Sequence, residues 1–448
     1  MDTRFVPHDD ALASGRPTGV RWGVLAWLSS LALLLYIDRV CIGVAEKSIR
    51  AKLNLEKDDI SWAMNAFTLA YCLFEVPTGH WGDRFGSRGV IARVVIWWSV
   101  FTALTGAAMG LYSLVAIRFL FGAGEAGAYP NVALVITKWF PLHERGKARG
   151  VVTTMSLLGA AAAPVVAGYL IGWFGWRATF AVFGAVGVVW SAVFYWWFRD
   201  APAEHPRCNV AEKNLIALET PGNHSQASHE SIPWPVVLTS PNTWFLGAIM
   251  MSSASLFYFH FQWFSTYLVE AHGEPPESAP WLTSVVMIGP ACGCLLGGLL
   301  VDALLKRGAH RKWSRRLVGG GALSLAAGSM LAVPYAQSAL IATLCSTAAG
   351  FFAQLAVPTW WTVVSEISGK HGAAMWGLMN SMGGLGVIVT TFLIGRFITA
   401  REQLGYLPLD CWNPAFSGVG LFLVTGAALW LMVDPTRSIV ERTARAQS

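Results

Sequence analysis

Long apolar runs alternate with short polar segments along almost the whole chain. A helix that crosses a membrane needs about 20 mostly apolar residues. A sheet with open edges could not satisfy its backbone hydrogen bonds within lipid, so each run is interpreted as a helix. The pattern predicts membrane spans near residues 22–45, 60–81, 89–109, 112–135, 150–172, 178–197, 242–268, 280–303, 317–335, 338–362, 373–397 and 413–433.

A long polar stretch after the sixth run divides the spans into two equal groups. Its length and mixed composition are typical of a linker between domains. The pattern therefore predicts an all-α membrane protein with twelve transmembrane helices in two six-helix halves. The expected segments are a tail at 1–20, a half at 21–198, a linker at 199–240, a half at 241–434 and a tail at 435–448.

Composition agrees with a lipid environment. Of the 448 residues, 54% are hydrophobic and 13% are charged, whereas a soluble domain has about 25% charged residues. The net charge of +6 could suggest nucleic acid, but the basic residues lie in short loops between apolar runs. The first twenty residues lack an apolar signal core, so we expect no cleavable signal peptide.

The distribution of Lys and Arg predicts the orientation, because cytoplasmic loops carry the excess. Most of the 32 basic residues fall on the cytoplasmic side if both termini are cytoplasmic. The poorest fit is the first outside loop, with Lys47, Arg50, Lys52 and Lys57. We expect a multi-pass protein of the inner (cytoplasmic) membrane with both termini inside. No metal-ligand, phosphate-loop or nucleophile motif is present, so we expect neither an enzyme nor a cofactor.

Internal symmetry supports the two halves, since many transporters are built from repeats. The sequence from Gly150 to Gly159 in the fifth span parallels that from Gly377 to Gly386 in the eleventh. A loop motif after the second span is echoed after the eighth by Gly298, Asp302 and Arg307. The residues of this motif are Gly79, Asp83, Arg84, Gly86 and Arg88.

This loop resembles the motif between helices two and three of the major facilitator superfamily. The resemblance implies that Asp83 caps a neighbouring helix and that the motif's arginine pairs across the interface between the halves. Such charges suit a conformational latch, because they can pair in one state and separate in the other. The latch would include Asp302 of the second half. The alternative is positive-inside charge with a tight turn at Gly86.

Four ionisable residues lie within predicted spans of the first half. Asp38 and Arg39 are in the first span, and Arg118 and Glu125 are in the fourth, seven residues apart and thus on one helix face. A charge in the middle of a membrane costs at least about 2.5–3.5 kcal/mol, which makes each a candidate functional residue. A substrate that competes for an arginine would free a carboxylate to take a proton. The alternative is a static salt bridge that fixes packing.

Three segments narrow the resemblance to the anion:cation symporter family. They are Tyr36–Arg39, Arg118–Pro130 and Lys138–Gly146. That family includes bacterial galactonate, glucarate and hexuronate transporters, mammalian sialin and vesicular glutamate carriers. The resemblance implies a monomer with the major facilitator fold and proton-driven uptake of an organic anion.

By analogy with that family, Asp38 and Glu125 would take up protons, and Arg39 would hold the substrate carboxylate. Arg118 would tether Glu125, and Tyr71 would face the central cavity. The sequence departs from the family at Glu75, where many members carry Gln. Glu75 could belong to the latch or reach interfacial water.

The second half offers polar and aromatic candidates instead of charge pairs. Such groups suit a hydroxylated ligand. We expect substrate contacts from Asn380, Ser381, His260, Gln262 and Trp360. A lone histidine is more often a packing residue, and tryptophans also form the belt at the membrane interface.

The combined prediction is proton-coupled symport of a small organic anion by alternating access between the halves. The expected partners are this anion, protons and membrane lipid, with no nucleic acid. The expected substrate is a sugar acid such as galactonate, glucarate or a hexuronate. An exchanger or uncoupled facilitator of another carboxylate is the alternative, and an anion sensor without transport is a further one.

Overall fold

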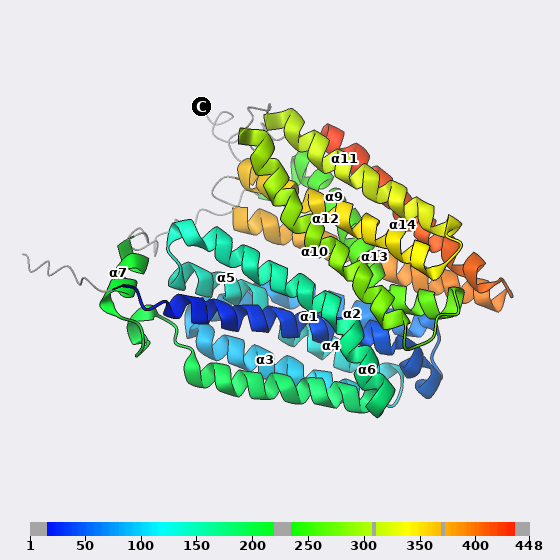
Figure 1. The fold of residues 1–448 in the computed structure, drawn as a ribbon, viewed down its shortest axis with the longest axis horizontal. Helices are drawn as coiled ribbons and strands as arrows, with labels where there is room; N and C mark the ends of the chain where they lie inside the picture. Colours follow the sequence, from blue (N-terminus) through cyan, green and yellow to red (C-terminus); the bar gives the residue numbers. More distant parts are fainter. Residues whose placement is uncertain (1–15, 219–233, 307–310, 369–371, 435–448) are drawn as a thin grey trace, which may run out of the picture.

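The computed structural model describes residues 16–218, 234–306, 311–368 and 372–434, and they form an all-helical bundle (Figure 1). The helices of the first half are α1 (Val20–Leu53), α2 (Lys57–Phe85), α3 (Ser87–Thr105), α4 (Leu111–Glu125), α5 (Ala128–Trp139) and α6 (Leu142–Trp197). Those of the second half are α9 (Pro241–Ala271), α10 (Ala279–Lys306), α11 (Arg311–Ala332), α12 (Ala339–Ser368), α13 (Gly372–Gln403) and α14 (Pro408–Met432).

Ten helical segments of the described chain are long and apolar enough to cross a membrane. One of them joins α4 and α5, and another is α6, which contains both the fifth and the sixth predicted span. The two spans meet at Gly175, whose φ of 77° is a conformation that glycine adopts without steric cost. α2 is outside the ten, but it packs against α4 in the first half and α13 in the second. The predicted all-α membrane fold is confirmed.

The halves meet along two equivalent interfaces, α2 with α13 and α6 with α10. α2 and α6 contain the predicted second and fifth spans of the first half, and α10 and α13 contain their counterparts, the eighth and eleventh. Each interface therefore joins the second span of one half to the fifth span of the other. A third contact joins α1 to α9, where Gly43 lies so close that a Cβ would stand 2.6 Å from the carbonyl oxygen of Phe261. The arrangement agrees with the repeat that the sequence predicts.

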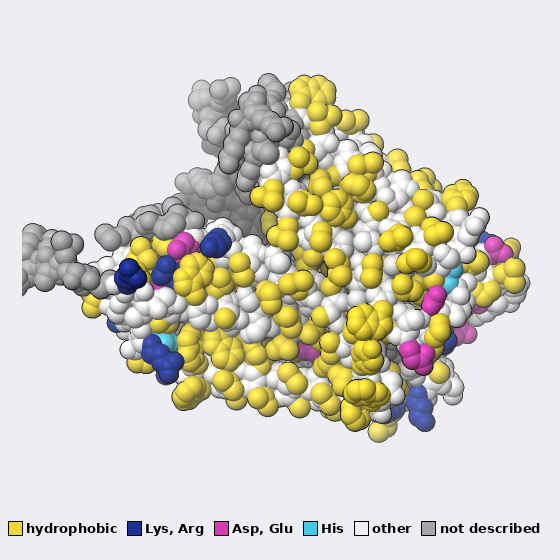
Figure 2. Space-filling model, in the orientation of Figure 1, with side chains coloured by type: hydrophobic (Ala, Val, Ile, Leu, Met, Phe, Trp, Pro, Cys, Tyr) yellow, Lys and Arg dark blue, Asp and Glu magenta, His cyan; other side chains and the backbone are white. Residues whose placement is uncertain are grey.

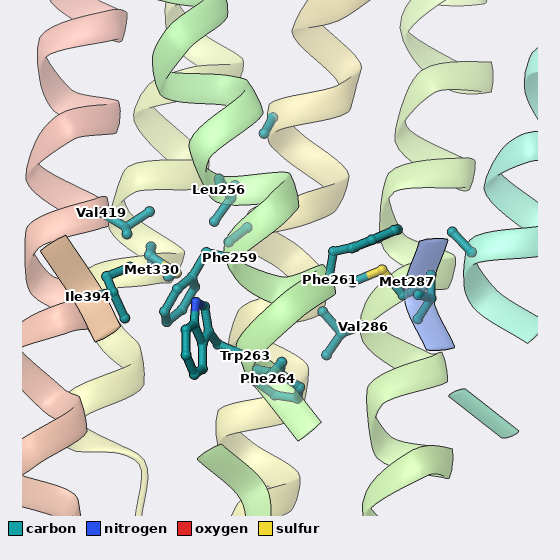
Figure 3. Close-up of a cluster of buried hydrophobic side chains, with 14 of the residues drawn as sticks. Leu256, Phe259, Phe261, Trp263, Phe264, Val286, Met287, Met330, Ile394 and Val419 are labelled. Atoms are coloured by element: carbon teal, nitrogen blue, oxygen red, sulfur yellow. The ribbon is translucent and has the colours of Figure 1, made fainter. Parts of the chain in front are cut away.

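α9 packs at the centre of the second half. Its side chains Leu256, Phe259, Trp263 and Phe264 are buried against residues of α10, α11, α13 and α14 (Figure 3). Its neighbour Phe261 is also buried, and it belongs to a helix that touches α1 of the other half. α9 therefore has apolar residues on nearly every side, which is typical of a fully enclosed helix.

Hydrophobic and charged side chains occupy different parts of the bundle surface (Figure 2). Hydrophobic side chains cover the middle of the visible face, and charged side chains gather near its two ends. Large apolar residues such as Trp196, Leu299 and Leu393 are more than half exposed. Apolar patches of this extent indicate contact with lipid.

The start of the linker is ordered and docks on the first half. Two short elements, η1 (Pro202–Glu204) and α7 (Val210–Leu218), follow α6, and α8 (Trp234–Thr239) precedes α9. Glu212 of α7 accepts hydrogen bonds from the backbone N–H groups of Val20 and Arg21 at 3.0 and 3.1 Å. The linker thus satisfies N–H groups that the first turn of α1 would otherwise leave unpaired.

Candidate transport site

The site is centred on an ion pair between α1 and α4. Arg39 donates from Nε to Glu125, and the two side chains are 5% and 1% exposed. Glu125 is the last residue of α4, and only Ala126 and Gly127, whose backbones stay in the right-handed helical region, separate it from α5. The second carboxylate oxygen of Glu125 has no hydrogen-bond partner in the described chain.

Aromatic rings surround the guanidinium of Arg39. Its Cζ lies 4.6 Å from the ring centre of Tyr71, 5.3 Å from that of Phe67 and 5.4 Å from that of Tyr36. Each of these distances is within the range of a cation–π contact. The second half contributes Tyr258, whose hydroxyl oxygen lies 3.5 Å from Nη1 of Arg39. Arg39 is therefore a cation at the meeting point of both halves.

Asp38 and Arg118 are buried close to this pair, each 5% exposed or less. Asp38 is in electrostatic range of Glu125 and Arg118, but the described chain gives it no ion-pair partner. Arg118 lies against the rings of Phe67 and Phe121, with its Cζ 5.0 and 4.6 Å from their centres. Its Nε has no hydrogen-bond partner in the described chain.

Among the described residues Arg118 and Glu125 are within electrostatic range but make no salt bridge; Arg39 binds one carboxylate oxygen of Glu125, and the other has no hydrogen-bond partner there. The two residues share a face of α4, as the spacing predicts, but the ion pair is made across helices. Sequence spacing on one helix cannot reveal this competition from α1.

A second polar contact spans the halves. The side-chain amide of Asn380 on α13 donates to the two carboxylate oxygens of Glu75 on α2, at 3.4 and 3.1 Å. Glu75 follows Tyr71 by one helical turn and is in electrostatic range of Arg39. The contact brings the predicted Asn380 to the same region as Arg39. Glu75 thus lies between the two halves.

The other candidates of the second half lie within its own packing. Gln262 accepts from Thr391 at 2.9 Å, and the indole N–H of Trp360 donates to the carbonyl of Leu246 at 2.9 Å. His260 is 1% exposed, and its ring lies 5.6 Å from that of Phe264. Ser381 is half-buried beside Asn380. The substrate roles of these residues stay predictions.

The structure describes only part of the predicted latch. Gly86 turns the chain between α2 and α3 with a φ of 82°. The side chain of Arg88 donates to the carbonyl of Tyr195 at 2.9 and 2.6 Å, and its backbone N–H donates to Asp200. The first contact remains within the first half, and the second reaches the start of the linker. The side chains of the remaining candidates lie outside the described residues; they are those of Gly79, Asp83, Arg84 and Asp302.

An ion network that sequence reasoning did not predict joins the halves at one end of the bundle. Lys57 of α2 pairs with Glu270 of α9 at 2.8 Å and with Glu402 of α13. Arg50 of α1 also reaches Glu270, at 2.6 Å, and pairs with Glu46 of its own helix. We call this end, with the final turns of α1, α9 and α13, the Lys57 end. The sequence gives one indication of this network: Arg50 and Lys57 belong to the basic loop that fits the cytoplasmic excess of Lys and Arg poorly.

Comparison with known proteins agrees with this architecture. Residues 28–391 match the model of the Major Facilitator Superfamily. The chain is 29% identical to a probable sulfoacetate transporter of Cupriavidus necator over 93% of this chain and 94% of that one. It is 30% identical to a probable galactarate/D-glucarate transporter of Bacillus subtilis over 95% of each chain.

A solved structure supports the fold alone. A bacterial homologue of the human lysosomal transporter Spinster, in an inward-facing and occupied conformation, superposes with a TM-score of 0.74 at 21% identity. The match covers 93% of this chain and 97% of that chain. The predicted family is confirmed and the chain is a transporter, not an enzyme: it belongs to the Major Facilitator Superfamily, in the anion:cation symporter family of anion transporters.

Proposed function

We propose that this protein imports a sugar acid together with protons by alternating access. The observation that carries the proposal is the buried pair of Arg39 and Glu125, which both halves surround. A buried pair is costly to maintain for stability alone, because desolvation of the two charges offsets their attraction. A role in transport, in which the pair opens during the cycle, explains why a pair with this desolvation cost is present.

The pair provides a direct route to coupling. A substrate carboxylate and Glu125 are both acceptors for the same guanidinium, so they compete for Arg39. Protonation of Glu125 removes its negative charge and frees Arg39 for the substrate. Asp38 supplies a second carboxyl group that is buried beside Glu125 and Arg118. Uptake of protons at these two residues therefore favours binding of the anion.

The rest of the site suits a hydroxylated substrate. Tyr71 and Tyr258 place phenol groups beside Arg39, and Asn380 places an amide farther along the interface between the halves. These groups can donate to and accept from sugar hydroxyls, while Arg39 holds the carboxylate. Galactonate and hexuronates have this combination of one carboxylate and several hydroxyls. Tyr71, Asn380, Ser381 and Arg118 complete the proposed binding region.

The proposed orientation follows the distribution of Lys and Arg, with both termini in the cytoplasm of a cell whose inner membrane holds the protein. The Lys57 end then faces outward, and its ion network closes the outer side. Opening of this network and closure of the opposite end would move the site from one side to the other. The protein would work as a monomer, since each monomer contains both halves.

The test is uptake of D-galactonate and D-glucuronate by the purified protein in liposomes with an inward proton gradient. The wild type should accumulate one of these acids, and a protonophore should abolish the accumulation. Arg39→Lys keeps the charge but loses the guanidinium fork, so we expect uptake to fall at least about tenfold. Arg93→Lys is the matched control, because Arg93 is exposed on α3. Uptake that ignores the proton gradient and survives Arg39→Lys would refute the proposal.

A further inference from the structure

Glu75 is a carboxylate that the coupling scheme does not use. It lies on α2, one turn after Tyr71, and is half-buried at the interface with α13. Both of its oxygens face the amide of Asn380, at 3.1 and 3.4 Å. The described chain contains no Lys or Arg within ion-pair distance of Glu75. Among the described residues, the groups that stabilise its charge are the amide of Asn380 and the more distant Arg39.

The position of Glu75 defines a second end of the proposed binding region. Arg39 already contacts Glu125 through Nε and the aromatic rings through its faces. Glu75, with Asn380 of α13 against it, lies one helical turn after Tyr71, roughly 5 Å farther along α2. A substrate whose carboxylate is held by Arg39 would extend its far end toward Glu75.

The balance of buried charge also depends on Glu75. The region contains two arginines, Arg39 and Arg118, and three carboxyl groups, Asp38, Glu125 and Glu75. If Asp38 and Glu125 are protonated, as coupling requires, the two arginines and Glu75 leave a single positive charge. One negative charge on the substrate neutralises it, whereas a dianion would leave an excess negative charge in a site shielded from water.

We propose that Glu75 determines specificity, and that with Asn380 it selects monoanions with a hydroxyl or other hydrogen-bond donor at the far end. A substrate donor group can bond to the Glu75 carboxylate in place of the Asn380 amide. A second carboxylate or a sulfonate would meet like charge there instead. This inference rests on the proposed function and names the substrate class for the same site.

If the inference is right, this chain differs from two of its relatives in the number of acidic groups on its substrate. Sulfoacetate and glucarate, which the names of those proteins mention, each carry two acidic groups. Galactonate and galactarate have the same configuration at every hydroxyl-bearing carbon and differ at one end, where galactonate has a hydroxymethyl group and galactarate, which the second name also mentions, has a carboxylate. This pair of ligands therefore tests the charge at the far end with little change in shape.

The experiment measures binding and uptake of D-galactonate and galactarate by the full chain in liposomes at one pH. Like charge at the far end of a partly shielded site opposes the second carboxylate, so we expect a preference of roughly tenfold or more for galactonate. Glu75→Gln should reduce or reverse this preference by improving galactarate binding. Glu75→Asp keeps the charge and should keep the preference. Glu277→Gln, at an exposed carboxylate outside the site, should change nothing.

Three results would overturn the inference. The wild type could prefer galactarate, or Glu75→Gln could leave the ratio unchanged while galactonate is still transported with protons. In both cases the specificity role of Glu75 fails and the proposed function stands. If the wild type binds neither acid, the proposed function fails and the inference fails with it. Glu75→Asp also shows whether a loss of uptake in Glu75→Gln reflects folding or charge.

Discussion

At the scale of single residues, Arg39 has more partners than one carboxylate requires. It pairs with Glu125, lies over Tyr71 and approaches Tyr258 of the other half. A static salt bridge needs only the first of these contacts. The additional ones hold the guanidinium in place when Glu125 leaves it, so Arg39 remains available to a substrate anion.

Glu125→Gln should make anion affinity much less dependent on pH, with Asp38 as the remaining proton site of the scheme. The neutral amide resembles the protonated acid, so it no longer competes as an anion for Arg39. We expect the variant to bind galactonate at pH 8 about as tightly as the wild type does at low pH, and to exchange substrate without accumulating it. Binding titrations from pH 5.5 to 8.5 measure this. A variant that keeps the pH dependence of the wild type would assign the coupling to another group.

The sequence is most informative about residues that are costly in lipid. Asp38, Arg39 and Glu125 are charged within apolar runs, so they are recognisable without a structure, and the structure buries them together. The bond between Glu75 and Asn380 could not be predicted, because the two residues are 305 positions apart and meet only through the packing of α2 on α13. Arg118 shows a further limit of sequence-based prediction: Glu125, the carboxylate expected to pair with it, is bound by Arg39 of another helix.

At the scale of elements, the apolar runs predict where helices are but not how they are joined. The fourth predicted span consists of two helices, α4 and α5, separated by Ala126 and Gly127. The linker likewise contains α7, whose nine residues are too few to give a clear periodic signal. Its order comes from Glu212 and the start of α1, a contact between segments distant in sequence.

Glu212→Gln should loosen this contact between the linker and α1. Burial alone would raise the pKa of Glu212, but bonds from Thr18, Arg21 and Val20 lower it below its ordinary value. A carboxylate with a lowered pKa stabilises the folded state above its unfolded pKa of about 4.3, and this contribution is lost as pH falls through the folded value. We expect the variant to melt earlier than the wild type at pH 7.

The difference in melting temperature between Glu212→Gln and the wild type should shrink as pH falls from about 4.3 through the lowered pKa of folded Glu212, below which both proteins lack the charge. Thermal unfolding of the purified proteins across this range gives the comparison. Glu204→Gln, at an exposed position of η1, is the control. A difference that is constant with pH would show that the Glu212 charge does not hold the linker.

At the scale of the whole molecule, the two halves are joined by charge at the Lys57 end. Lys57 is 1% exposed at its side chain and pairs with acids on α9 and α13 of the other half. The internal repeat predicts which helices face each other. It does not predict this network, because the network joins side chains of four helices that are far apart in the sequence.

Lys57→Gln should therefore favour the conformation that is open at the Lys57 end. The substitution leaves Glu270 and Glu402 without a cation that bridges them, although Arg50 still reaches Glu270. Distances between spin labels on exposed positions of the two halves would report the population. We expect longer distances at the Lys57 end than in the wild type, and no change in Lys47→Gln, whose side chain is exposed. Equal distances in all three proteins would mean that the network does not control opening.

The most direct test of the central claim is proton entry driven by substrate. Liposomes that contain the protein and an internal pH indicator receive external D-galactonate, with no proton gradient imposed. The account predicts that the interior acidifies in the wild type and that this signal disappears in Glu125→Gln, although the variant still exchanges the acid. Galactonate entry without acidification in the wild type would contradict coupling through Arg39 and Glu125.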